Sequence, residues 1–179
     1  MNRDMAMVLA IAAAVAVCPG AVLSEQLESP VSPEAFLKKA AQGQQAEIAL
    51  GQLASKKATD PQVKQFGAHM IEDHQKASQE VQQLASREGI QLPSQMSEKH
   101  KQKQQQFSQL SGKEFDRAYM MYMLRNHMID VTEFEQQAPA IKDPQVQQWA
   151  AGALPILKQH LQQAQQIATE MGLQTTHAR

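Results

Sequence analysis

Five polar residues interrupt apolar stripes that otherwise repeat at alternating steps of three and four residues. They are Glu47, His74, His127, Asp130 and His160. Such stripes are typical of helices that pack into a bundle, so these five side chains are expected to face its core. Burying carboxylates and imidazoles there costs on the order of several kcal/mol unless the groups are paired.

A single transition-metal ion would pair them, because imidazole and carboxylate ligands suit Zn, Cu, Fe and Mn, and bundle cores commonly hold such ions. We therefore predict one metal ion of unknown identity, with Glu47, His74, His127 and His160 as ligands and Asp130 in support. The alternative is a metal-free network of Glu–His hydrogen bonds that holds the helices in register. His69, His100 and His177 are expected at the surface, and no catalytic residue is predicted.

Helix start and stop signals predict the four long helices that would carry these residues. Ser-Pro or Asp-Pro pairs at 32–33, 60–61 and 143–144 combine an N-cap with a proline in the first turn. Residues 111–114 have the sequence of a capping box, and Gly89 and Gly172 are typical C-terminal caps. The predicted helices span 33–58, 61–88, 112–138 and 144–171. Four of the polar residues then lie roughly 21–26 Å along their helices, which predicts a single level.

The connections between these helices predict how they are arranged. The first two and the last two helices have almost no loop between them, so each pair should form an antiparallel hairpin. The two hairpins share a repeated sequence, at 60–66 and 143–149, which suggests pseudo-two-fold symmetry. The polar connector from 89 to 111 is expected to contain an exposed fifth helix over 94–109. We predict an all-α, ferritin-like four-helix bundle of two helical hairpins with a long helical crossover connector.

The first 24 residues are predicted to be a signal peptide, because an apolar stretch from Met5 to Val17 precedes a permitted cleavage site after Ser24. The remaining divisions are a short segment at 25–32, the bundle at 33–173 and a tail at 174–179. We expect an exported, periplasmic protein with no transmembrane span after processing. Attachment of lipid at Cys18, or association with the outer membrane, is the alternative.

Composition limits the partners that this protein is expected to have. With 17 basic and 18 acidic residues, the chain has a net charge of −1, which argues against a nucleic-acid partner. The predicted mature chain contains no cysteine, which excludes disulfides and thiolate metal ligands there. Besides the metal ion, a second copy of the chain or another protein of the cell envelope remains open as a partner.

The sequence resembles a family of exported bacterial proteins that contain a ferritin-like domain of unknown function and are often labelled outer-membrane or periplasmic proteins. The resemblance covers nearly the whole predicted mature chain. It implies a ferritin-like bundle and export, and it supplies no settled activity. The matching segments are Glu47-Ile48-Ala49-Leu50-Gly51, Asp73-His74, Gly112 with Phe115-Asp116 and Tyr119, His127, and Leu154-Pro155 with His160.

The histidine spacing argues against a di-iron oxidase. Di-iron bundles use a Glu-x-x-His motif on two helices, whereas Ile71, Leu124 and Leu157 precede the three histidines by three residues. We therefore favour a mononuclear metal site, or none, in a protein of metal handling or stress protection. The alternative is a metal-free structural or interaction module of the cell envelope.

Overall fold

The computed structural model describes residues 32–173, and this part of the chain is all-helical. It contains α1 (Pro33–Lys57), α2 (Pro61–Arg87), α3 (Glu98–Ser108), α4 (Gly112–Gln137), a single turn of 3-10 helix η1 (Ala138–Ala140) and α5 (Pro144–Glu170). The four long helices end within one residue of the predicted bounds, and the connector helix α3 is shorter than predicted. The signal-peptide prediction, Cys18, His177 and the tail lie outside the described residues.

Helix caps explain why these bounds follow so directly from the sequence. The side chains of Ser32, Asp60 and Asp143 accept hydrogen bonds from backbone N–H groups in the first turns of α1, α2 and α5. Gly89 and Gly172 have positive φ angles of 65° and 66°, and each lies just after the end of a long helix.

The predicted capping box at the start of α4 is wrong. The Ser111 side chain makes no capping hydrogen bond. Gly112 begins α4 with a φ angle of 59°, and this left-handed conformation differs from the right-handed first turn that a capping box requires. A different contact holds this end of the bundle. The buried Asp116 carboxylate accepts hydrogen bonds from the backbone N–H groups of Thr59 and Asp60 and from the Thr59 hydroxyl.

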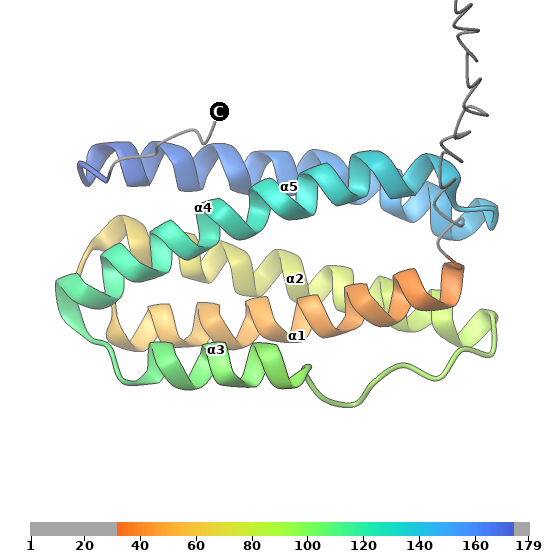
Figure 1. The fold of residues 1–179 in the computed structure, drawn as a ribbon, viewed down its shortest axis with the longest axis horizontal. Coiled ribbons are helices and arrows are strands. Elements are labelled where there is room, and N and C mark those ends of the chain that lie inside the picture. Colours follow the sequence, from red (N-terminus) through yellow and green to blue (C-terminus); the bar gives the residue numbers. More distant parts are fainter. Residues whose placement is uncertain (1–31, 174–179) are drawn as a thin grey trace, which may run out of the picture.

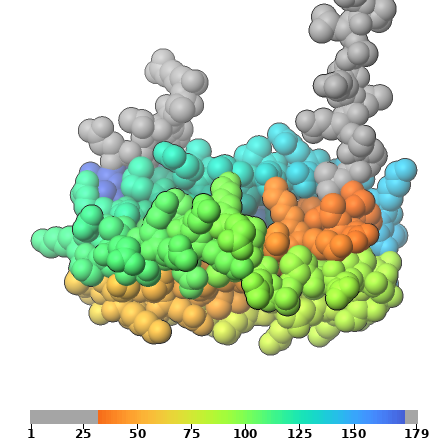
Figure 2. All heavy atoms as spheres, turned by 60° about the horizontal axis from the view of Figure 1, so that its bottom comes forward, coloured from red at the N-terminus to blue at the C-terminus, as the bar shows by residue number. Residues whose placement is uncertain are grey.

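The four long helices lie side by side, with α1 and α5 running in one direction and α2 and α4 in the other (Figure 1). The main contacts are between α1 and α2 and between α4 and α5, so the two predicted hairpins are present. The connector places α3 along α1, and α2 and α4 run parallel. Figure 2 brings forward the side of the molecule that lies at the bottom of Figure 1, and on this side α3 lies at the surface beside the first turns of α1.

The apolar core has two parts, and the polar residues lie between them. These two parts are separate clusters of buried apolar residues. Each long helix contributes residues to one cluster before its predicted site residues and to the other cluster after them. On α4, for example, Met123 and Leu124 belong to the first cluster, while Phe134 packs against the second. The polar side chains therefore share one middle layer of the bundle, as the equal helix positions predict.

A close approach of two glycines sets the relative height of α1 and α2. A Cβ atom on Gly51 would lie 2.7 Å from the Gly67 carbonyl oxygen and 2.8 Å from Ile71 Cγ1. These contacts are too short for any side chain at Gly51. Gly51 lies one turn after Glu47, and Ile71 lies one turn before His74, so this contact fixes the level at which the two site residues face the core.

Candidate metal centre

Three of the predicted residues, His74, His127 and His160, come together in the middle layer. Each offers one ligand atom, and these atoms all lie within 4.8 Å of one another. The ring centroids of His160 lie 5.4 Å from those of both other histidines. The three side chains come from α2, α4 and α5, and all are buried, with exposed fractions of 6%, 0% and 2%.

One nitrogen of each imidazole is held by an oxygen acceptor from outside the cluster. His127 Nδ1 donates to the Met123 carbonyl oxygen at 3.0 Å, and His160 Nε2 donates to Asp73 Oδ2 at 2.8 Å. His74 Nδ1 is hydrogen-bonded to Gln44 Oε1. A carbonyl or carboxylate oxygen can only accept, so each of these nitrogens carries the proton. The remaining nitrogens are His74 Nε2, His127 Nε2 and His160 Nδ1.

These three remaining nitrogens are buried and have no hydrogen-bond partner. Burial lowers the pKa of His74 well below its usual value and lowers that of His127 to about 4, and neighbouring histidines add to both shifts. At neutral pH these two imidazoles are therefore uncharged. His74 and His127 therefore present unshared electron pairs of nitrogen inside the protein, and unsatisfied buried polar atoms of this kind are costly.

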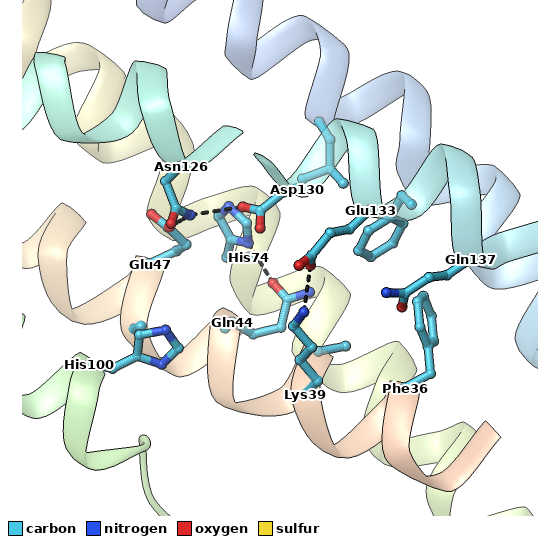
Figure 3. A pocket seen from close by; sticks show the side chains of 15 residues that line it. Phe36, Lys39, Gln44, Glu47, His74, His100, Asn126, Asp130, Glu133 and Gln137 are labelled. Carbon is cyan, nitrogen blue, oxygen red and sulfur yellow. Dashed lines mark hydrogen bonds and ion pairs between the residues drawn. The ribbon is translucent and has the colours of Figure 1, made fainter. Parts of the chain in front are cut away.

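The other two predicted residues, Glu47 and Asp130, form a separate cluster through Asn126. The Asn126 Nδ2 amide donates to Glu47 Oε1 at 2.9 Å and to Asp130 Oδ2 at 2.8 Å (Figure 3). Burial raises the pKa of Glu47 to about 8, with a contribution from Asp130, and it raises the pKa of Asp130 to about 7, with a contribution from Glu133. Neither carboxylate belongs to the group of mutually close ligand atoms.

Three residues that lie in or beside these clusters were not predicted as site residues from the sequence. Gln44 lies one turn before Glu47 on α1, which is a usable signal, but glutamine is so abundant in this chain that it did not stand out. Asn126 precedes His127 and lies off the apolar stripe, so its spacing carries no signal. His100 was expected at the surface and is half-buried, because α3 packs along α1. His69 is exposed, as predicted.

Two pockets reach His74 from different sides of the bundle. The first lies between α1 and α4 and includes the carboxylates of Glu47, Asp130 and Glu133 (Figure 3). The second lies between α2 and α5, beside Asp73 and His160. Gly152 and Ala153 line the second pocket, and their small size leaves room next to the histidines. The cluster is thus buried but can be approached from solvent.

Together, the helices and the clustered imidazoles define an all-helical protein with a buried three-histidine centre. Residues 19–167 match the model of the family described as "Domain of unknown function (DUF4142)", so the chain belongs to this family. No functionally curated protein matches the sequence. Within residues 32–173, no helix combines the length and the apolar character needed to cross a bilayer.

The solved structures that the fold resembles include two forms of one protein. CopM in the Cu(II)-bound form has a TM-score of 0.68 and 15% sequence identity, and the match covers 80% of this chain and 99% of CopM. CopM in the apo form has a TM-score of 0.64 and 16% identity, and the match covers 78% of this chain and 98% of CopM. At this identity, the similarity establishes a shared fold.

Proposed function

We propose that His74, His127 and His160 bind one transition-metal ion and that the protein handles metal in the cell envelope. Two observations carry this proposal: buried histidines from three helices have mutually close ligand atoms, and each of them has one buried nitrogen without a hydrogen-bond partner. Metal-binding histidines commonly have their other nitrogen fixed by an oxygen acceptor, and all three histidines have such a partner here.

The geometry is compatible with one ion. Metal–nitrogen distances are about 2.0–2.1 Å. Three nitrogens within 4.8 Å of one another need inward shifts of less than about 1 Å each to reach that distance from a common centre. Of the divalent metals that suit imidazole, Cu(II) binds nitrogen sites most tightly, and one structure of similar fold, CopM, binds Cu(II). We therefore propose Cu(II) as the preferred ion.

The wider setting of this function is also part of the proposal. We propose that the bundle is ferritin-like in layout, which the parallel directions of α2 and α4 support (Figure 1). We further propose that the protein is exported to the periplasm, on the basis of the predicted signal peptide at 1–24. Its role there would be the sequestration or transfer of copper, and hence protection from metal stress, because three buried imidazoles provide metal ligands.

The metal-free alternative has less support. It requires hydrogen bonds between Glu47 and the histidines, and among the described residues Glu47 is hydrogen-bonded to Asn126 instead. A network that stabilised the fold by itself would satisfy its own buried atoms. Here three imidazole nitrogens and one Glu47 oxygen have no partner, which is the pattern expected of groups that await a ligand.

Titration of the purified exported protein with Cu(II), in competition with a chelator of known affinity, tests the proposal. We expect one tightly bound ion, with nitrogen ligands visible in the electron paramagnetic resonance spectrum. His127→Ala should weaken binding at least 100-fold. His69→Ala, which removes an exposed histidine of α2, is the matched control and should bind as the wild type does. Equal loss in both variants, or no stoichiometric binding of Cu(II), Zn(II) or Co(II), would refute the proposal.

A further inference from the structure

The pocket between α1 and α4 contains two carboxylates that no cationic side chain contacts, although Lys39 lowers the pKa of Asp130 from a longer distance. Glu47 lies on α1 and Asp130 on α4, and both line this pocket (Figure 3). Lys39 also lines the pocket, but it is paired with Glu133 at 2.6 Å. Among the described residues, neither Glu47 nor Asp130 forms an ion pair. Two carboxylates in this position need either protons or a bound cation.

Asn126 holds these two carboxylates close together. Because its single amide nitrogen donates to both, the bonded oxygens are at most about 5.7 Å apart, which is the combined length of the two hydrogen bonds. These two hydrogen bonds use one oxygen of each carboxylate and leave the other oxygen available to a ligand. Asp130 Oδ1 accepts no hydrogen bond from the described residues, and Glu47 Oε2 is fully buried without a partner. Glu47 as a whole is only 4% exposed.

We propose that Glu47 and Asp130 form a second cation site, separate from the three histidines, that binds a divalent cation with a preference for oxygen ligands. Carboxylate oxygens and water suit Mg, Ca and Mn ions, whereas the nitrogen centre suits Cu and Zn. Glu47 and Asp130 provide oxygen ligands, and the pocket has room for water to complete the coordination shell. Burial and a neighbouring carboxylate raise the pKa values of both carboxyls, and a bound cation would favour their ionised forms.

This site goes beyond the proposed function, since it does not require metal at the histidines. The sequence alone placed Glu47 and Asp130 in one ligand set with the histidines. The structure separates the two kinds of ligand, because the histidine nitrogens are mutually close without a carboxylate among them. A chain with both sites would hold two ions of different chemistry in one layer of the bundle, and one pocket connects the carboxylates with His74.

Mn(II) is a suitable probe, because the electron paramagnetic resonance signal of the free ion disappears when the ion binds. We expect the purified exported protein to bind one Mn(II), and His127→Ala to retain this binding within threefold. Glu47→Gln combined with Asp130→Asn should weaken Mn(II) binding at least tenfold and leave Cu(II) binding in place. Glu135→Gln, which changes a carboxylate of α4 that pairs with Lys158 and does not line this pocket, is the matched control and should bind Mn(II) within threefold of the wild type.

The possible results separate the two proposals. Retention of Mn(II) binding without any Cu(II) binding would refute the histidine centre and support the carboxylate site. Absence of Mn(II) binding in the wild type would show that protons alone satisfy the carboxylates and would overturn the second site. Loss of Mn(II) binding in His127→Ala would overturn it as well, because it would mean a single joint site. If the double variant does not fold, Glu47→Gln alone serves, since its amide oxygen still accepts from Asn126.

Discussion

Replacing Glu47 by glutamine should change how the stability of the metal-free protein depends on pH. Burial raises the pKa of Glu47 from 4.5 to about 8 in the folded chain. The folded state therefore holds a proton that the unfolded state releases at neutral pH. The stability that this proton provides is fully present below pH 4.5, and it is lost as the pH rises through 8.

The size of the effect follows from the two pKa values. Each pH unit in this range costs about 1.4 kcal/mol per proton, and the loss levels off above the folded pKa. Between pH 6.5 and 8.5, Glu47 should therefore remove about 2 kcal/mol from the free energy of unfolding. Glu47→Gln cannot titrate, so its stability should fall by about 2 kcal/mol less than that of the wild type over the same range.

Urea unfolding followed by circular dichroism, in the presence of a metal chelator, measures this difference. His127, with a pKa lowered to about 4, contributes a loss of stability as the pH falls from 6.5 towards 4, so the chosen range largely avoids its effect. Glu135→Gln removes a carboxylate of α4 that lies outside the pocket that contains Glu47 and has a side chain 48% exposed, and it should retain the wild-type dependence. The reasoning would be refuted by pH profiles of the wild type and Glu47→Gln that agree within about 0.3 kcal/mol.

Three further predictions test the contacts that position the centre. Gly51→Ala should destabilise the protein by about 1–3 kcal/mol in the same urea assay, because its Cβ would meet α2. A Cβ at Gly43 would meet nothing within 4 Å, so Gly43→Ala should stabilise the protein by about 0.5–1 kcal/mol. The opposite order of stabilities would contradict this account. Asp116→Ala leaves two N–H groups and a hydroxyl without their acceptor. Thermal unfolding should show that the free energy of unfolding falls by about 2–4 kcal/mol. A decrease below about 0.5 kcal/mol would show that water replaces the carboxylate. Asp73→Asn should weaken Cu(II) binding about 10- to 100-fold with unchanged stoichiometry, because it disturbs the hydrogen-bond partner of His160. Glu72→Gln, at the neighbouring exposed position, should bind Cu(II) as the wild type does. Equal affinities of Asp73→Asn and the wild type would exclude this positioning role.

Most of the fold could be predicted from local signals. N-caps, prolines and C-terminal glycines act within one helical turn of themselves, so the bounds of α1, α2 and α5 follow from residues such as Asp60 and Gly89. The start of α4 at Gly112 was also predicted, but its predicted capping box was wrong, because Gly112 adopts a left-handed conformation that the sequence does not reveal. The exposure of His100 was also mispredicted, since it depends on the packing of α3 against α1, which are far apart in the sequence.

The candidate site was likewise predicted only in part from the sequence. The sequence by itself predicted that four residues, Glu47, His74, His127 and His160, share one layer, because residue spacing sets the height of a side chain along its helix. Only the tertiary structure decided which of them meet. The rotation of each helix about its axis, and the close Gly51–Gly67 contact between α1 and α2, depend on packing across the bundle. That packing brings three imidazole nitrogens together, and it leaves the two carboxylates with Asn126 in a separate pocket.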